Sequence, residues 1–136
     1  MRRFLMLVAW TLGVVGCGGG SGGGGVVVPP SPTLQAVQAA IFTPHCAISG
    51  CHVGAGAPFG LDLSDGAAYG NLVNVPSAEL PAFDRIEPSV AEDSYLFMKV
   101  SDDPRMLGDP MPALGSPLSA QKLQLLADWI GQGANP

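Results

Sequence analysis

Two cysteines and a histidine stand close together in one stretch of this 136-residue chain. Cys46 and Cys51 are separated by four residues, and His52 follows the second cysteine directly. Thiols beside an imidazole support three kinds of chemistry. They form thioether bonds to a haem whose iron the imidazole binds, they close a disulfide, or they hold a metal ion directly.

The three kinds of chemistry stay open on these residues alone. A disulfide between Cys46 and Cys51 would close a six-residue loop without obvious strain, and an oxidising compartment favours it. A zinc site would use both cysteines with His52 and His45, but the adjacent Cys51 and His52 make awkward ligands for one ion. Zinc therefore ranks last of the three.

A late loop offers a further sulfur ligand. Met111 lies between Pro110 and Pro112, which restrict the local backbone and so hold the methionine sulfur in one direction. Met106 lies in the same loop without a following proline. Met98 falls in a predicted helix, where methionine is usually a core residue.

The first residues have the features of a secretory signal. Two arginines precede an apolar run from Phe4 to Val15, which is too short for a good membrane span. The sequence Val14-Val15-Gly16-Cys17 resembles the lipobox of bacterial lipoproteins. The resemblance implies a signal peptide over residues 1–16 and lipidation of Cys17.

The lipid anchor would hold the protein at the periplasmic face of the cell envelope or at the cell surface. Gly18, and no aspartate, follows Cys17, and by resemblance to the sorting rule of enteric bacterial lipoproteins this implies the outer rather than the inner membrane. Residues 17–31 are then a tether, because their glycines bury no apolar area and lose much entropy on ordering. An ordinary signal peptide cut near Gly20 would instead remove Cys17.

The remaining residues, 32–136, are expected to fold as one small domain. After removal of the leader, four cations face eleven carboxylates, and the formal charge is near −7. Nucleic-acid binding requires a basic surface, so this composition argues against it. A domain of this size that is rich in Gly and Pro has a thin core, and we expect a disulfide, a metal or a cofactor to stabilise it.

Apolar spacing and capping residues predict a mostly α-helical domain. No alternation of strands and helices is visible, and no internal repeat. The last helix is capped by Ser119 and ends at Gly131 to Gly133. Its predicted buried stripe is Leu123, Leu126, Ala127 and Ile130, widened by Leu125 and Trp129. The earlier predicted helices run from Ser31-Pro32 to Pro44, from Ser64 or Asp65 to about Leu72, and from Glu92-Asp93 to Asp102-Asp103-Pro104, and a long irregular loop follows from Arg105 to Pro117.

From Ile41 to Ala134 the chain resembles a small class I cytochrome c domain. The resemblance implies a helical fold with long loops and packed N- and C-terminal helices. It also implies covalent haem c on Cys46 and Cys51, with His52 as the proximal and Met111 as the distal iron ligand. The matching segments are Ile41-Phe42-Thr43-Pro44, Cys46 with Cys51-His52, Gly60-Leu61-Asp62-Leu63, Asp93-Ser94-Tyr95-Leu96 with Lys99, Met111-Pro112, Asp128-Trp129-Ile130 and Gly133-Ala134.

The cysteine spacing departs from the family, in which two residues commonly separate the cysteines, against four here. Arg85 is a candidate contact for a haem propionate, although an ion pair with Glu87 explains it equally well. His45 is expected at the surface or behind the site, and Trp129 in the core.

The expected function is that of an exported, lipid-anchored monohaem electron carrier with unknown redox partner proteins. With both axial positions filled the iron has no open site, so we expect no enzyme. A peroxidase-like activity would require that Met111 does not ligate. The alternative is a structural or binding lipoprotein, stapled by a Cys46–Cys51 disulfide and free of haem.

Overall fold

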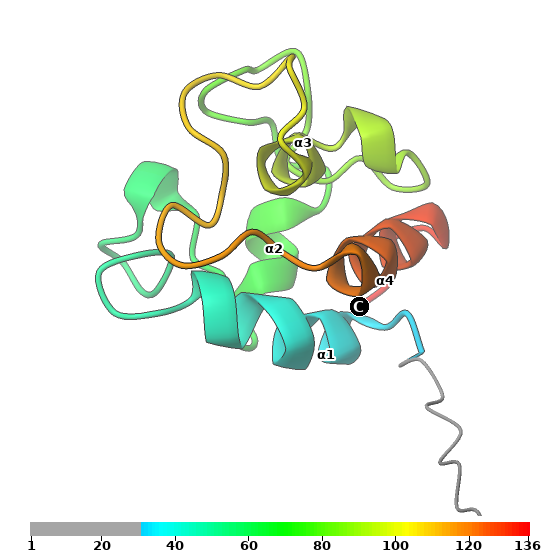
Figure 1. Ribbon diagram of the computed structural model, residues 1–136, viewed down its shortest axis with the longest axis horizontal. Helices are drawn as coiled ribbons and strands as arrows, with labels where there is room; N and C mark the ends of the chain where they lie inside the picture. Colours follow the sequence, from blue (N-terminus) through cyan, green and yellow to red (C-terminus); the bar gives the residue numbers. More distant parts are fainter. Residues whose placement is uncertain (1–30) are drawn as a thin grey trace, which may run out of the picture.

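Helices dominate residues 31–136, the part of the chain that the computed structural model describes. These residues form a small domain with four α-helices and no β-strand among them, as the sequence predicted in outline. The predicted signal peptide over 1–16, Cys17 and nearly all of the tether over 17–31 lie outside the described residues. In chain order the elements in Figure 1 are α1 (Leu34–Val37), the π-helix η1 (Gln38–Cys46), the 3₁₀ turn η2 (Pro58–Gly60), α2 (Ala68–Leu72), the 3₁₀ turn η3 (Ala91–Asp93), α3 (Tyr95–Ser101) and α4 (Ala120–Gly131).

The first helix begins later than the sequence predicted. Thr33 is its N-cap, and the Thr33 hydroxyl accepts a hydrogen bond from the Ala36 amide at 3.2 Å. The prediction that Ser31 and Pro32 start the helix is therefore wrong. Thr33 is the residue whose side chain pairs with a first-turn amide that has no partner within the helix.

The same helix also runs further than predicted. It continues without a break from α1 into η1 and passes through Pro44, where the sequence predicted its end. A proline ring normally clashes with the carbonyl four residues earlier. The wider π turn relieves this clash, and its last bond joins the Ala47 amide to the Phe42 carbonyl at 2.7 Å. Cys46 consequently lies at the end of a helix and not in a loop.

The short helix α2 is preceded by a turn. The Ser64 carbonyl accepts hydrogen bonds from the amides of Ala67 and Ala68, both at 3.0 Å. The N-cap is therefore Ala67, and the predicted start at Ser64 or Asp65 is wrong. The predicted end at Leu72 is confirmed.

The next helix begins after a short 3₁₀ turn. Residues Glu92 and Asp93 belong to η3, so the predicted start of the helix there is wrong, and α3 begins at Tyr95. The Ser94 hydroxyl explains the break, because it accepts from the Glu87 amide and donates to the Val90 carbonyl, both at 2.9 Å. At the other end, Asp102 adopts a left-handed conformation with φ 58° and ends α3 where predicted.

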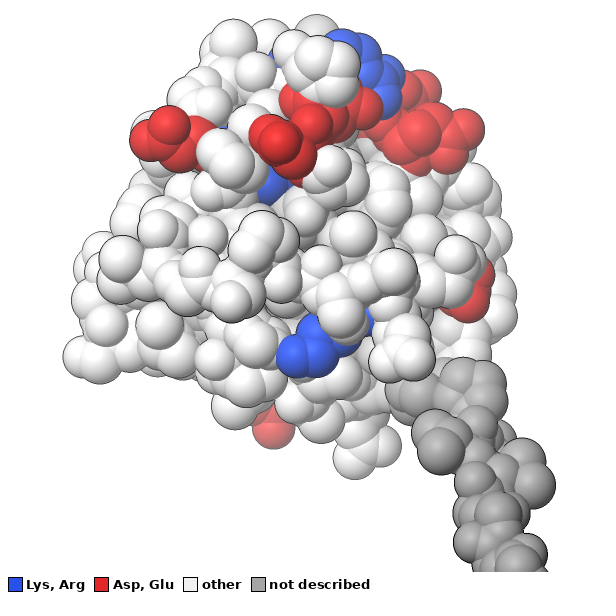
Figure 2. All heavy atoms as spheres, in the orientation of Figure 1, with Lys and Arg blue, Asp and Glu red and all other residues white. Residues whose placement is uncertain are grey.

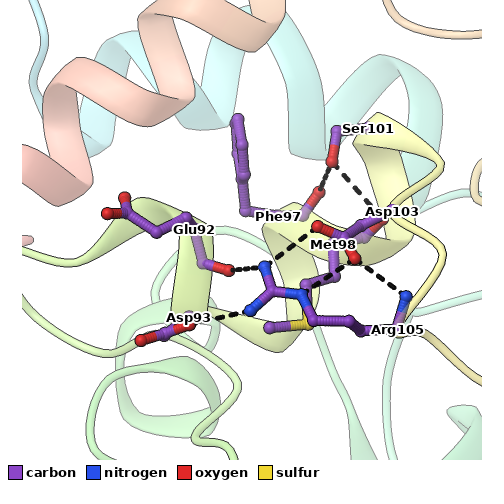
Figure 3. Close-up of polar contacts among 7 residues, drawn as sticks. All are labelled: Glu92, Asp93, Phe97, Met98, Ser101, Asp103 and Arg105. Atoms are coloured by element: carbon purple, nitrogen blue, oxygen red, sulfur yellow. Dashed lines mark hydrogen bonds and ion pairs between the residues drawn. The ribbon is translucent and has the colours of Figure 1, made fainter.

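One arginine fastens the turn after α3 to the turn before it (Figure 3). The Arg105 guanidinium pairs with Asp103 at 2.9 Å and with Asp93 at 3.0 Å, and it donates to the Glu92 carbonyl at 2.6 Å. These charge-assisted bonds connect η3 to the start of the irregular segment that follows α3.

The last helix, α4, confirms its predicted cap. The Ser119 hydroxyl accepts from the Lys122 amide at 3.4 Å. The buried stripe is centred differently from the prediction: Leu123 and Ala127 lie at its margin and are only half-buried. The fully buried side chains of α4 are Leu125, Leu126, Trp129 and Ile130.

The N- and C-terminal helices pack against each other, and α3 packs on α4 (Figure 1). Trp129 is 1% exposed within this core, and its indole nitrogen donates to the Asn135 carbonyl at 2.8 Å. The prediction that Trp129 is a core residue is confirmed.

Candidate functional site

The stretch between the two cysteines folds back as a tight turn. The Cys51 amide donates to the Ile48 carbonyl at 2.9 Å, and Gly50 inside this turn has φ 82°. Glycine accepts this conformation without a Cβ penalty. The His52 amide then donates to the Cys46 carbonyl at 3.0 Å and closes the loop against the end of η1. The longer cysteine spacing is thus taken up by the turn from Ile48 to Cys51.

The two thiols are not joined to each other. Both cysteines are half-buried. Burial is the main reason why the pKa of the Cys46 thiol is raised to about 11, and the nearby Cys51 adds to it. The free Cys46 thiol therefore stays protonated at neutral pH.

The imidazole of His52 is oriented by a backbone carbonyl. Its Nδ1 lies 3.1 Å from the Leu61 carbonyl oxygen, which can only accept, so Nδ1 carries the proton. In the neutral ring this leaves Nε2 with a free lone pair. A histidine that binds a metal almost always has its other ring nitrogen engaged in this way.

The segment that supplies this carbonyl is itself fixed. The Leu63 amide donates to the His52 carbonyl at 2.9 Å, so the chain on both sides of the contact is paired. The buried Gln38 side chain of η1 donates to the Leu63 carbonyl at 3.0 Å and to the Thr43 hydroxyl at 3.0 Å. The helix η1 therefore fixes the segment 61–63, whose Leu61 carbonyl orients His52.

A largely apolar cavity lies beside these residues. The cavity is partly open to solvent, and apolar atoms make up most of its wall. Cys46, His52 and Met111 all line it. An adjoining cavity shares Cys46, His52 and Met111 and is also lined by Cys51. Apolar side chains from η1, the 58–63 segment and α3 supply most of the wall, among them Phe42, Leu61, Leu63, Leu96 and Val100.

The fold brings Met111 to the same cavity as His52, although 58 residues separate them in the sequence. The loop after α3 descends past the cysteine loop in Figure 1 before it reaches α4. The Met111 amide donates to the Lys99 carbonyl at 2.7 Å. Met98 is fully buried, and neither Met98 nor Met106 lines either cavity.

Arg85 also lines the cavity, and the alternative that it pairs with Glu87 is wrong. Its guanidinium donates to two backbone carbonyls, of Asn71 at 2.8 Å and Phe59 at 2.7 Å. Within residues 31–136 it forms no ion pair with a carboxylate. Burial lowers the pKa of Arg85 below its ordinary value, and the group stays charged.

Three polar residues that the sequence did not identify as functional line the cavity. Glu79, Tyr95 and Lys99 all line it. Lys99 is only 8% exposed and pairs with Glu79 at 3.5 Å. The signal in the sequence is that Lys99 is the one charged residue of α3, on a helix that is otherwise apolar apart from Tyr95 and Ser101.

His45 is half-buried, and its Nε2 pairs with the Lys122 ammonium of α4. It lines the adjoining cavity but not the one that holds Arg85. No group of three or more His, Cys, Asp or Glu side chains in the described part of the chain is arranged to hold a metal ion.

No helix among the described residues is long and apolar enough to cross a membrane. No protein-family description, curated protein or solved structure matches this chain.

Proposed function

We propose that this chain is a small monohaem c-type cytochrome that carries single electrons. The observation that supports it best is the convergence of Cys46, His52 and Met111 on one largely apolar cavity, with Nε2 of His52 free to bind a metal. The helical architecture and the contact between α1 and α4 agree with a cytochrome c-like domain with long loops.

Each residue has a distinct role in this proposal. Cys46 and Cys51 would form thioether bonds to haem c, and both thiols are free for such bonds. His52 would bind the iron through Nε2, and Met111 would bind it through its thioether sulfur. Arg85 has no carboxylate partner among residues 31–136, and its charge would suit an anionic propionate.

The residues at the cavity fit a flat apolar group with a charged edge. A covalent attachment also supplies the staple that a thin core requires. The bound group would supply one-electron transfer, and a thioether ligand favours the reduced state. If His52 and Met111 both bound the iron, no site on it would be open to a substrate, so we propose an electron carrier and not an enzyme.

The distribution of charge on the surface supports docking on protein partners. Carboxylates gather at the α3 end of the face in Figure 2, while the surface over the loop between α3 and α4 is mostly uncharged. An acidic surface argues against nucleic-acid binding, and it attracts partner proteins with basic surfaces. We propose that unknown redox partner proteins meet the domain at the cell envelope, where lipidated Cys17 would anchor it, preferably in the outer membrane.

The alternative, a disulfide-stapled lipoprotein without haem, leaves the cavity and the free Nε2 of His52 without a purpose. Absorbance separates the two. The chain is exported from cells with haem-attachment machinery that accepts four residues between the cysteines, and the purified protein is examined before and after reduction.

A c-type Soret band and a reducible α band are expected, and neither Cys46→Ala nor Cys51→Ala should yield fully attached haem. Cys17→Ala is the matched control, because Cys17 belongs to the predicted lipobox and not to the predicted haem-attachment pair, so the pigment should be kept. Colourless, fully processed protein with a Cys46–Cys51 disulfide in its mass spectrum would favour the alternative.

A further inference from the structure

The loop that carries Met111 is held to α3 at Leu107 by two side chains. The Lys99 ammonium donates to the Leu107 carbonyl at 2.7 Å. The Tyr95 hydroxyl accepts from the Leu107 amide at 3.1 Å. Both backbone polar groups of one loop residue are therefore engaged by side chains one helical turn apart.

These two side chains are themselves fixed. Lys99 is 8% exposed and Tyr95 is 4% exposed, so neither moves freely in solvent. Glu79 pairs with Lys99 at 3.5 Å, and burial together with Glu79 raises the pKa of the Tyr95 hydroxyl. A charge-assisted hydrogen bond in such a site is stronger than one in water.

A third bond reaches the methionine directly. The Met111 amide donates to the carbonyl of Lys99 at 2.7 Å, and this is the one hydrogen bond between backbone groups found for residues 107–117 within the described chain. The loop between these points has no helix or strand of its own. Its path past the cavity thus depends on contacts with α3.

We propose that Lys99 and Tyr95, supported by Glu79, are positioning residues that hold the 107–111 segment so that Met111 faces the cavity. This clamp, defined as Glu79, Tyr95 and Lys99, rests on the proposed function only in that Met111 is taken as an iron ligand. The holding of the loop itself is independent of haem.

The test compares matched pairs of variants. Lys99→Met removes the ammonium but keeps the stem, and Lys122→Met is its control because Lys122 pairs with His45 and does not contact Leu107. Tyr95→Phe removes only the hydroxyl, and Tyr69→Phe is its control on α2. Circular dichroism establishes that each variant is folded.

Amide hydrogen exchange of Leu107 and Met111 is measured in haem-free and in haem-loaded protein. Exchange at both amides should rise by about tenfold or more in Lys99→Met, as expected for the loss of one charge-assisted bond. Tyr95→Phe should raise exchange at Leu107 more than at Met111. Lys99→Arg, which keeps a cationic donor, should restore part of the protection.

The second measurement is the sulfur-to-iron charge-transfer band in the far red. It should weaken in Lys99→Met and Tyr95→Phe and persist in both controls, an effect that a purely structural role elsewhere would not produce. Unchanged exchange and an unchanged band in both variants would overturn the clamp. Wild-type protein without pigment would overturn the proposed function, but amide exchange in the haem-free protein would still test the clamp. If Lys99→Met does not fold, the exchange measured in Tyr95→Phe tests the clamp instead.

Discussion

At the scale of single residues, the proposed iron ligand His52 is oriented by a single polar contact. The Leu61 carbonyl fixes which ring nitrogen carries the proton and therefore which nitrogen is left to bind a metal. Met111 reaches the same cavity from a loop without regular structure. The iron chemistry proposed here thus depends on two side chains that are positioned by backbone groups.

Replacement of Met111 by alanine tests the distal ligand. The sulfur-to-iron charge-transfer band should disappear. The reduction potential should fall on the order of 0.1 V or more, within the roughly 0.8 V range that axial ligands set. Potentiometric titration measures the change, with Met106→Ala as the control from the same loop. A band that survives in Met111→Ala would assign the ligand to another residue.

The Cys46 thiol has a measurable signature in haem-free protein. Its raised pKa of about 11 means that the neutral thiol is favoured in the folded state. Its alkylation rate should therefore keep rising with pH up to about 11, whereas an ordinary thiol levels off above about 8.5. The free energy of unfolding should fall as the pH rises from about 9 to about 11, because over this range the Cys46 thiol loses its proton in the unfolded chain but keeps it in the folded one.

Iodoacetamide labelling followed by peptide mass spectrometry measures the rate at each cysteine separately. Labelling of Cys46 that levels off near pH 9 would show that the thiol is not held in the buried environment described above.

At the scale of elements, the helix and the turn around Cys46 determine where the two thiols lie. The π-helix η1 continues through Pro44, and the turn from Ile48 to Cys51 absorbs the longer cysteine spacing. Gly50 has φ 82° in that turn, a conformation that L residues rarely adopt.

Gly50→Ala should therefore destabilise the domain by about 1 kcal/mol or more and reduce the yield of attached haem. Gly56→Ala is a matched control, since an added Cβ meets nothing at either site and no positive φ is found at Gly56. Denaturant unfolding measures the free energy of unfolding. Equal effects of the two substitutions would argue that the turn conformation is unimportant.

At the scale of the whole molecule, the packing of α1 and α3 on α4 builds the core behind the cavity. Trp129 is the largest side chain in that core, at 1% exposure. Its indole nitrogen also ties α4 to the C-terminal residues through Asn135. Trp129 belongs to the same core cluster as Val37 of α1 and Leu96 of α3, so loss of its side chain should affect the packing of all three helices.

Trp129→Ala should lower the free energy of unfolding by about 3–5 kcal/mol, a large part of the total for a domain of this size. Gln121→Ala on the exposed face of α4 should change it by less than about 0.5 kcal/mol. Thermal and denaturant unfolding of haem-free protein provide the comparison. A small effect of Trp129→Ala would contradict the core assignment.

The attachment to a membrane also belongs to the whole molecule and stays a prediction, because Cys17 lies outside the described residues. Cys17→Ser should move the protein from the membrane fraction to the soluble fraction without loss of pigment, since two acyl chains provide stable anchoring. Fractionation and mass spectrometry of the N-terminal peptide measure both. Wild-type protein that is soluble and unlipidated would favour an ordinary signal peptide.

The sequence by itself determined features that depend on neighbours a few residues away. The mostly helical class, the Ser119 cap and the end of α3 at Asp102 follow from local capping and backbone preferences, and they are confirmed. The same local reasoning misplaced the end of the first helix at Pro44, because a switch to π geometry removes the clash on which that prediction depended.

Only the tertiary structure decided how distant residues meet. Arg85 binds carbonyls 14 and 26 residues away and not the neighbouring Glu87, and Leu61 orients His52 across a folded-back segment. Lys99 becomes a buried clamp for Leu107 only when the loop folds over α3. Such contacts depend on the path of the chain in space, whereas the residue types at Cys46, Cys51, His52 and Met111 were readable from the sequence.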